Sequence, residues 1–354
     1  MQRRSFLELA GVVAAGAARA VARPMQARLP ASPLPGRIKP PMLRPGDRVA
    51  LINPSTAIHD PQMVLRAQAV IAALGLTPVV SEGLTDRPRD LTASVDQRLR
   101  ELHGAFADPS IRGVFCARGG YGVSEIMNGV DFGVIRANPK VFVGFSDITL
   151  LHLAIRRETG LVTFHGRMPA MREFPAFSLE ALRRALFGRE PLGQLVNPPE
   201  TAPLRPAYPL RTIAGGMATG PLVGGNLSMI MAAMGTPWEI DTRGAIFFFE
   251  DVDESPYRIA RMLLTLQHAG KLREAAGIVV GHCARCDGPS EVTPYSLNEV
   301  FDQILRPAKV PVFSGLLLGH TSEQITVPLG VRARIDADAC TLSLLEAGID
   351  GAAP

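Results

Sequence analysis

The segment from Val141 to Thr149 has the order of residues that a serine nucleophile requires. An apolar strand at residues 141–143 runs into Gly-Phe-Ser, which ends at Ser146, and a helix is predicted from Thr149. Such a sharp strand-to-helix turn lifts a serine hydroxyl clear of the backbone, and the free amides of the helix N-terminus can stabilise an oxyanion. The alternative is that Ser146 or Asp147 is an ordinary helix cap. From this pattern alone, the cap is the better explanation.

A glycine-rich sequence, Arg118-Gly119-Gly120-Tyr121-Gly122, follows an earlier apolar strand. Glycines let backbone amides approach a ligand closely. A simple tight turn and a phosphate cradle are the alternatives. The glycine spacing matches neither the dinucleotide fingerprint nor the Walker form, so the support for nucleotide binding is weak.

A serine nucleophile needs a base, and the base needs an orienting acid. Among 7 histidines, His320 stands just past an apolar strand, which is where a functional loop residue belongs. Glu250 closes the very apolar sequence 247–249, and a carboxylate in that position needs a partner or solvent. The acidic cluster 250–254 is explained equally well as a solvated loop or as a cation site.

The pair Cys283 and Cys286, preceded by His282, could indicate zinc or redox chemistry. No second Cys or His pair stands at zinc-ribbon spacing, and haem attachment would need the histidine after the second cysteine. Packing or a local disulfide explains such a pair better. We therefore expect no metal and no cofactor.

The elements that must hold these residues alternate between strands and helices. Strands are predicted at 48–52, 77–80, 113–116 and 141–143, and helices at 61–74, 94–107 and 149–156. This alternation is typical of βαβ units with a parallel sheet, in which ligands lie beyond the carboxyl ends of the strands. The glycine-rich sequence and Ser146 both follow such ends.

The second half of the chain predicts another α/β domain. A loop and then a helix are predicted over 221–234, strands at 245–249 and 278–280, a helix at 256–266, and short strands at 324–327 and 331–335. Residues 194–219 are rich in Pro and Gly, lack a helical face and look like an interdomain linker. The predicted domains are therefore an N-terminal domain at 46–193 and a C-terminal domain at 220–354.

The first residues resemble an export signal. Residues 1–22 combine Arg3 and Arg4 with a short apolar stretch and a small-x-small cleavage site, and Arg-Arg-Ser-Phe-Leu resembles a twin-arginine signal. The apolar stretch is shorter than the roughly 20 residues that span a bilayer, so we expect cleavage rather than membrane insertion. Residues 23–45 are rich in Pro, Arg and Ala and are predicted to form a tether.

The composition is that of a soluble globular protein rather than a disordered one. The chain has 354 residues, 47% of them hydrophobic and 20% charged, with a net charge of +4. No run of Lys or Arg marks a nucleic-acid surface, so we expect no nucleic-acid partner.

Taken together, these segments resemble the LD-carboxypeptidase family, which also contains the microcin C self-immunity peptidases. The matching segments are Ala117-Arg118-Gly119-Gly120-Tyr121-Gly122, Asn138-Pro139-Lys140 with Gly144-Phe145-Ser146-Asp147-Ile148-Thr149, Thr163-Phe164-His165-Gly166, Gly220-Pro221-Leu222-Val223-Gly224-Gly225-Asn226-Leu227, Phe249-Glu250-Asp251-Val252 with Pro256-Tyr257-Arg258-Ile259, and Gly319-His320 before Pro328-Leu329-Gly330. They span roughly residues 45 to 340 in order. Several motifs in the right order are far more specific than any one of them.

The resemblance implies a fold, an activity and a set of roles. The fold is a Rossmann-like parallel-sheet N-terminal domain with a smaller C-terminal α/β domain that has additional strands. The activity is hydrolysis by a serine carboxypeptidase of the L,D-peptide bond that releases terminal D-alanine from a murein tetrapeptide, commonly in a homodimer. The export signal, rather than the resemblance, predicts a periplasmic or otherwise exported protein.

The implied roles are a catalytic triad of Ser146, Glu250 and His320, and an oxyanion hole formed by the amides of Gly120 and Asp147. The candidate substrate-binding residues are Asn226 and Tyr121.

Two departures and two alternatives accompany this assignment. Phe145 replaces a frequent Tyr and Arg167 replaces a usual Pro, which could alter the rim of the pocket. One alternative is an amidase of peptidyl-nucleotide adducts. The other is an exported binding protein that holds a peptide without cutting it.

Overall fold

A computed structural model of the chain describes residues 34–84, 92–199, 208–287 and 295–351. The chain divides into two units, Met1–Pro33 and Leu34–Pro354, and only the second contains described residues. The predicted signal at residues 1–22 and the first part of the predicted tether therefore lie outside the described residues.

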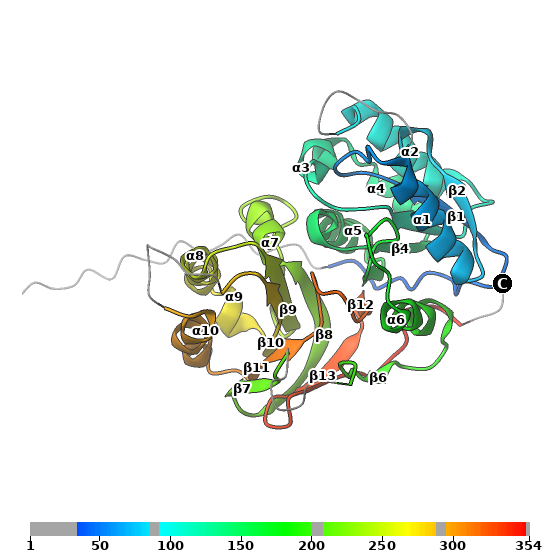
Figure 1. The fold of residues 1–354 in the computed structure, drawn as a ribbon. Coiled ribbons are helices and arrows are strands. Elements are labelled where there is room, and N and C mark those ends of the chain that lie inside the picture. Colours follow the sequence, from blue (N-terminus) through cyan, green and yellow to red (C-terminus); the bar gives the residue numbers. More distant parts are fainter. Residues whose placement is uncertain (1–33, 85–91, 200–207, 288–294, 352–354) are drawn as a thin grey trace, which may run out of the picture. The chain divides into compact units, whose positions relative to one another are not determined.

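The first sheet has 6 strands in the order β12-β5-β4-β3-β1-β2 (Figure 1). Its strands are β1 (Arg48–Ile52), β2 (Thr77–Val80), β3 (Gly113–Cys116), β4 (Val141–Gly144), β5 (Thr163–His165) and β12 (Val327–Leu329). β1 to β5 are parallel, whereas β12 runs antiparallel to β5. The parallel α/β fold predicted for this half is confirmed.

Helices separate the parallel strands of the first sheet along the chain. They are α1 (Pro61–Ala73), α2 (Val95–Ala107), α3 (Val123–Ile126), α4 (Phe132–Ala137), α5 (Thr149–Thr159) and α6 (Ala176–Phe187), with the 3₁₀ turns η1 (Glu82–Leu84), η2 (Met127–Gly129) and η3 (Ser146–Ile148). The N-caps of α1 and α2 are Asp60 and Ser94, whose side chains accept backbone N–H bonds. The predicted limits of both helices agree with these caps.

The second sheet has 8 strands in the order β6-β14-β13-β8-β9-β10-β11-β7. Its strands are β6 (Gly193–Gln194), β7 (Arg211–Ala214), β8 (Met217–Asn226), β9 (Ile246–Val252), β10 (Gly277–Ala284), β11 (Val312–Leu316), β13 (Arg332–Asp336) and β14 (Thr341–Leu344). The four strands β8, β9, β10 and β11 are parallel, and the outer strands are antiparallel. The second α/β domain with additional strands is thus confirmed.

Helices of the second half lie together beside this sheet. They are α7 (Leu227–Ala233), α8 (Pro256–His268), α9 (Lys271–Glu274) and α10 (Leu297–Leu305), followed by η4 (Arg306–Ala308). Figure 1 shows α8 and α10 side by side, and the two helices pack against each other.

One hydrophobic core is shared by the two sheets. Alternate residues of β1 (Ala50, Ile52) and of β9 (Phe247, Phe249) belong to the same buried cluster. α5 contacts both α7 and β8. Because apolar side chains of both halves are buried against each other, the two sheets are held together by the hydrophobic effect.

The prediction that residues 23–45 form a tether is wrong for the part that the structure describes. Ile38 pairs with Leu161, Pro41 pairs with Asp350, and Leu43 is 1% exposed in the core beneath α1 and α6. The sequence pattern does not indicate this packing, because apolar side chains in an extended, Pro-rich segment can be buried without helical spacing.

The prediction of a linker over 194–219 needs correction as well. This interval contains β7 and the first residues of β8, both of which pair within the second sheet. Residues 221–226, expected to form a loop before a helix, are the end of β8, which is a central strand. Glycine and proline in β8 remove the alternation that normally identifies a strand.

The first sheet also includes a strand from the C-terminal half of the chain. β12 comes from the C-terminal half but pairs with β5 of the first sheet, so the N-terminal half does not complete that sheet alone. Among the described residues, no helix has the length and apolar character that crossing a membrane requires.

Replacing Leu43 by alanine tests the packing of the segment before β1. We expect Leu43→Ala to lower the free energy of unfolding by about 2–5 kcal/mol, because it removes buried methyl groups from a close-packed core. Urea denaturation followed by circular dichroism measures this change.

The control is Leu65→Ala on α1, whose side chain is 55% exposed. Its effect should stay within about 0.5 kcal/mol. Equal effects of the two substitutions would show that the segment before β1 is a tether after all.

Candidate active site

Ser146 lies at a tight turn between β4 and α5. Its backbone has a φ of 62°, in the left-handed region that a non-glycine residue adopts rarely and at a cost. Gly119 leaves room for the turn, because a Cβ at that position would lie 2.9 Å from the Ser146 Cβ. A strained backbone that presents a serine hydroxyl is the geometry of a nucleophile elbow.

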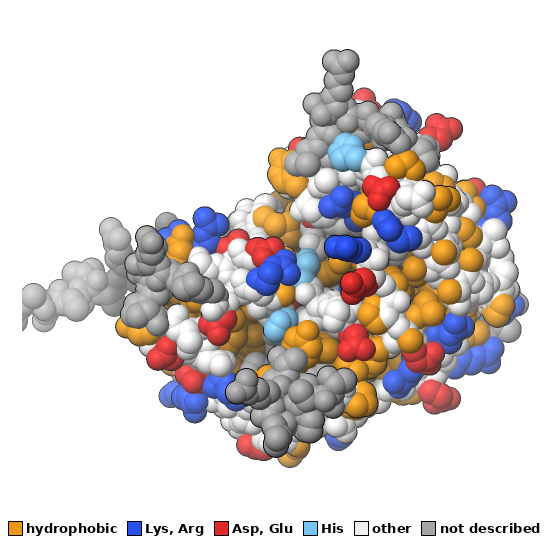
Figure 2. All heavy atoms as spheres, in the orientation of Figure 1, with side chains coloured by type: hydrophobic (Ala, Val, Ile, Leu, Met, Phe, Trp, Pro, Cys, Tyr) orange, Lys and Arg blue, Asp and Glu red, His pale blue; other side chains and the backbone are white. Residues whose placement is uncertain are grey.

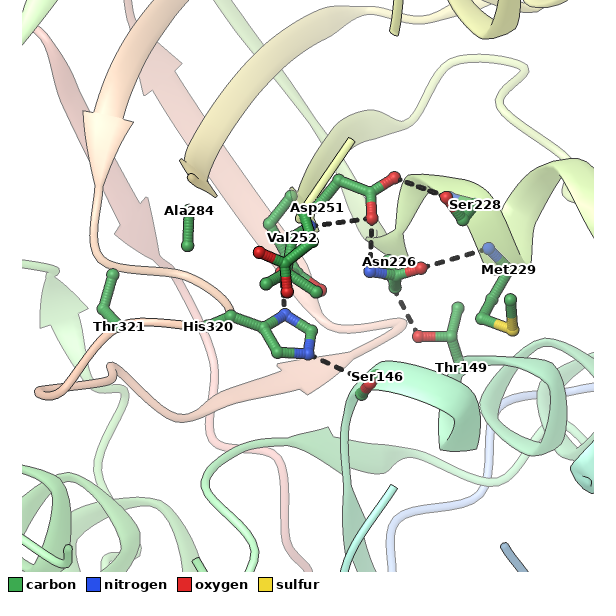
Figure 3. A network of polar contacts seen from close by, with 12 residues as sticks. Ser146, Thr149, Asn226, Ser228, Met229, Asp251, Val252, Ala284, His320 and Thr321 are labelled. Carbon is green, nitrogen blue, oxygen red and sulfur yellow. Dashed lines mark hydrogen bonds and ion pairs between the residues drawn. The ribbon is translucent and has the colours of Figure 1, made fainter. Parts of the chain in front are cut away.

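His320 lies between Ser146 and Glu250, and Figure 3 shows its contact with Ser146. Its Nε2 lies 3.0 Å from the Ser146 Oγ, and its Nδ1 lies 2.7 Å from the Glu250 Oε2. In the tautomer that fits a carboxylate, Nδ1–H donates to Glu250 and Nε2 accepts from the serine hydroxyl. The arrangement can therefore deprotonate Ser146 as it attacks a carbonyl carbon.

The carboxylate of Glu250 lies at the end of β9 and is fully buried. Gly319, next to His320, makes space for it: a Cβ there would lie 2.1 Å from the Glu250 Oε2. Oε1 of Glu250 has no hydrogen-bonding partner in the described part of the chain. His320 is consequently the group that compensates this buried charge.

The pKa of His320 reflects two opposing effects. Burial lowers it, but the charge of Glu250 and the hydrogen bond to it, with a smaller contribution from Asp251, raise the pKa above the usual 6.5. His152 differs, because burial lowers its pKa to about 4 and its ring nitrogens bond Thr163 and the Gly144 carbonyl. His320 is therefore the histidine whose environment favours the imidazolium that a general base must form.

The carboxylate of Asp147, after β4, is hydrogen-bonded to the segments that follow β1 and β3. Its Oδ2 accepts hydrogen bonds from the Ser55 Oγ (2.6 Å), after β1, and from the Val123 N (3.0 Å), where α3 begins after β3. Burial raises the pKa of Asp147, and these hydrogen bonds oppose the rise. The side chain next to Ser146 thus fixes the nucleophile turn to the adjacent loops.

The amides predicted to bind an oxyanion are those of Gly120 and Asp147. Neither N–H donates to an acceptor among the residues that the structure describes. The Tyr121 N, by contrast, donates to the Thr56 Oγ1 at 2.8 Å. Free amides beside Ser146 are consistent with an oxyanion site, and this assignment stays a prediction.

Asn226 occupies a buried network rather than an open surface. Its Oδ1 accepts from the Met229 N (3.1 Å), its Nδ2 donates to the Asp251 Oδ1 (3.1 Å), and its backbone N donates to the Thr149 Oγ1 (3.1 Å). Only 4% of Asn226 is exposed. The structure thus gives Asn226 a structural role that was not predicted, and its role in holding substrate stays a prediction.

Tyr121, the other residue predicted to bind substrate, is 52% exposed. The preceding Arg118 is half-buried, and its Nε donates to the Gly119 carbonyl. In the described residues, neither Nη atom of Arg118 has a hydrogen-bonding partner. Burial lowers the pKa of this guanidinium. This arginine, in the loop whose Gly119 lies against Ser146, was missed in the sequence, although it stands in the glycine-rich motif.

Asp251, adjacent to Glu250, was also missed. It accepts hydrogen bonds from Asn226, from Val252 and from both the backbone and the hydroxyl of Ser228. Burial raises its pKa to about 6. The sequence left the acidic cluster 250–254 open between a solvated loop and a cation site, and only the fold shows that Asp251 is buried.

Cys283 and Cys286 are buried free thiols, and hydrogen bonding to Cys286 together with burial raises the pKa of Cys283. No group of three or more His, Cys, Asp or Glu side chains that could hold a metal ion occurs within the described ranges.

Family models match both halves of the chain. The model described as the LD-carboxypeptidase N-terminal domain matches residues 49–166, and that of the C-terminal domain matches residues 219–335. The chain belongs to the LD-carboxypeptidase family. It is a serine-type carboxypeptidase, and the family resemblance read from the motifs is confirmed.

Relatives extend over nearly the whole chain. A Bacillus subtilis protein named "Probable murein peptide carboxypeptidase" is 39% identical over 88% of this chain and 95% of its own length. The Pseudomonas aeruginosa protein named murein tetrapeptide carboxypeptidase is 31% identical over 82% of this chain and 94% of its own.

Solved structures share the fold. The microcin C7 self immunity protein MccF in its apo state has a TM-score of 0.79 at 24% identity, covering 88% of this chain and all (100%) of its own. The muramoyltetrapeptide carboxypeptidase of Oxalobacter formigenes has a TM-score of 0.73 at 28% identity, covering 86% of this chain and 100% of its own.

The pH dependence of activity tests the pairing of His320 with Glu250. The base is active when neutral, so kcat/KM should fall on the acid side as His320 gains a proton, with a midpoint above the usual 6.5. Glu250→Gln removes the charge that raises this pKa. The midpoint should then move to lower pH while kcat falls, as measured by a pH–rate profile of peptide hydrolysis.

The control is Glu299→Gln, at the N-terminus of α10, which should leave the profile unchanged. An acid limb that stays in place in Glu250→Gln would contradict the pairing.

Proposed function

We propose that this enzyme hydrolyses the L,D-peptide bond that releases terminal D-alanine from murein tetrapeptides. The observation that carries the proposal is the hydrogen-bonded chain from Ser146 through His320 to the buried Glu250. The names of the Pseudomonas and Oxalobacter relatives support the choice of substrate. Two sequence predictions belong to the same proposal: export through the twin-arginine signal, and a homodimer.

The proposed mechanism has two acyl-transfer steps. As the Ser146 Oγ attacks the carbonyl carbon of the diamino acid, its proton passes to the His320 Nε2, and Glu250 stabilises the imidazolium. His320 then protonates the nitrogen of the leaving D-alanine, the C–N bond breaks, and an ester to Ser146 remains. Water, deprotonated by His320, hydrolyses the ester and restores the serine hydroxyl.

The oxyanion that forms in each step needs donors already in place. The proposed donors are the amide of Gly120, in the loop after β3, and the amide of Asp147, which follows Ser146 in η3. Preorganised amides at this position stabilise developing charge without reorganising, and one such donor lowers the barrier by about 2.7–4 kcal/mol.

Ser146→Ala tests the nucleophile. Release of D-alanine from a murein tetrapeptide should fall about 10⁴- to 10⁶-fold, since the acyl-enzyme cannot form. The circular dichroism spectrum and the unfolding midpoint should be retained. A coupled assay for free D-alanine measures the rate.

Ser110→Ala, in the exposed turn after α2, is the matched control and should keep full activity. If Ser146→Ala still released D-alanine, the proposed mechanism would be wrong. No release by the wild type, with turnover of an aminoacyl-sulfamoyl adenylate instead, would favour the amidase that the MccF fold likeness suggests. Tetrapeptide binding without hydrolysis of either compound would favour a non-catalytic binding protein.

We assign the binding of the substrate's C-terminal carboxylate to Arg118. A carboxypeptidase must bind the carboxylate of the residue that it releases, and a guanidinium matches that group with two parallel hydrogen bonds. The Nε bond to Gly119 holds the guanidinium of Arg118 in the loop beside Ser146. Its two Nη atoms are available for such a bidentate contact.

A pair of substrates tests this assignment. Arg118→Met should lower kcat/KM about 10- to 100-fold for a tetrapeptide that ends in free D-alanine, which corresponds to the loss of a charge-assisted hydrogen bond. For the same peptide ending in D-alanine amide, which lacks the carboxylate, wild type and variant should react equally. An equal loss on both substrates would show that Arg118 supports the loop rather than the carboxylate.

A further inference from the structure

We propose that Arg167 is a positioning residue that sets the approach of His320 to Ser146, by linking the loop after β5 to the loop that carries His320. This inference rests on the proposed function, because it concerns the same nucleophile and base. Arg167 has no contact with the reacting atoms and acts through the backbone of Thr321.

A link of this kind is needed because the two groups come from different sheets. Ser146 follows β4 of the first sheet, whereas His320 follows β11 of the second. The 3.0 Å contact between the His320 Nε2 and the Ser146 Oγ therefore depends on contacts across the boundary of the two sheets. An error of about 1 Å between reacting groups costs roughly 100-fold in rate.

The side chain of Arg167 spans this boundary. Its Nη1 donates to the Thr321 carbonyl at 2.7 Å, while its Nε and Nη2 donate to the Glu173 carbonyl at 3.0 and 2.6 Å. Its guanidinium carbon lies 5.7 Å from the centre of the Phe174 ring. Arg167 is 4% exposed, and in the described residues its hydrogen-bonding partners are backbone carbonyls rather than carboxylates.

The backbone around Arg167 is attached to the Ser146 side of the site. The Gly166 N donates to the Gly144 carbonyl at 3.1 Å, two residues before Ser146. The Ala170 N donates to the Ala117 carbonyl at 3.0 Å, at the end of β3. Arg167 is thus anchored to the strand ends that carry the nucleophile and the glycine-rich loop.

The other end of the link is the residue after His320. Thr321 is buried, and its own N donates to the Gly319 carbonyl at 2.9 Å, closing a tight turn around His320. A displacement of the Thr321 carbonyl would therefore also move the backbone of His320. Without Arg167, this buried carbonyl would lose its donor, and the turn would be free to move away from Ser146.

A second link lies on the opposite side of the triad. The Asn226 N donates to the Thr149 Oγ1 at 3.1 Å, between the end of β8 and the start of α5 (Figure 3). This contact places the second sheet against the helix that follows Ser146, but it does not touch the loop 317–325. Within the described residues, the bonds from the Gln324 N to the Ser178 Oγ (2.9 Å) and from the Leu317 N to the Asn197 Oδ1 (2.9 Å) also hold this loop, but Arg167 bonds the residue directly after His320.

Arg167→Met and Arg167→Lys test the inference. The methionine variant keeps an apolar stem but loses all donors, so kcat should fall about 10- to 100-fold while KM changes less than about 3-fold. The lysine variant should recover part of kcat, since its ammonium can still reach one carbonyl. The rate of Ser146 labelling by a fluorophosphonate, which needs His320 but no peptide, should fall in parallel with kcat.

Arg183→Met is the matched control, because Arg183 also donates to a backbone carbonyl, that of Ala73, on an exposed surface. It should retain the wild-type kcat and labelling rate. Wild-type labelling in both Arg167 variants would overturn the inference, as would a loss of kcat no larger than the unfolded fraction measured by circular dichroism.

The labelling assay separates this inference from the proposed function. If the wild type is labelled at Ser146 but releases no D-alanine, the murein assignment fails while the effect of Arg167 on labelling still decides its role. If D-alanine is released and labelling is insensitive to Arg167, only the positioning role fails.

Discussion

The site depends on one constraint: the proposed nucleophile, Ser146, and its proposed base, His320, are carried by different sheets and must meet within hydrogen-bonding distance. The shared core of Ala50, Ile52, Phe247 and Phe249 brings the sheets together. Apolar packing is close but not directional, so it sets the approach of the two layers without setting a side-chain distance. The final adjustment falls to directional hydrogen bonds near the triad.

Electrostatics favours the observed contact between His320 and Glu250. Glu250 is fully buried, and a buried carboxylate is costly unless it has a compensating partner. His320 supplies that partner, and Gly319 permits the close approach. Figure 2 shows histidine side chains reaching the surface in the middle of one face, with basic side chains nearby. A buried acid beneath a more accessible base suits proton transfer to a bound peptide.

Local signals in the sequence predicted much of the framework. The strands β1, β2, β3 and β4 follow from short apolar runs, and helical spacing predicted the limits of α1 and α2 to within one residue. Predictions failed where pairing or burial is non-local. β8 was missed because its glycines and Pro221 mask the alternation, although its neighbours β13 and β9 make it a central strand. The segment before β1 was assigned to a tether because nothing local shows that Leu43 is buried.

The sequence by itself determined the turn at Ser146, since an apolar strand, a glycine and a helix start are local features. It could not separate a nucleophile from a helix cap, and the family motifs, rather than the physical pattern, ranked Glu250 and His320 as partners. Only the tertiary structure decided that these side chains converge, because the 174-residue separation between Ser146 and His320 is closed by packing between two sheets. The same holds for Arg167 and Asp251, whose contacts arise from chain segments that meet only in the folded protein.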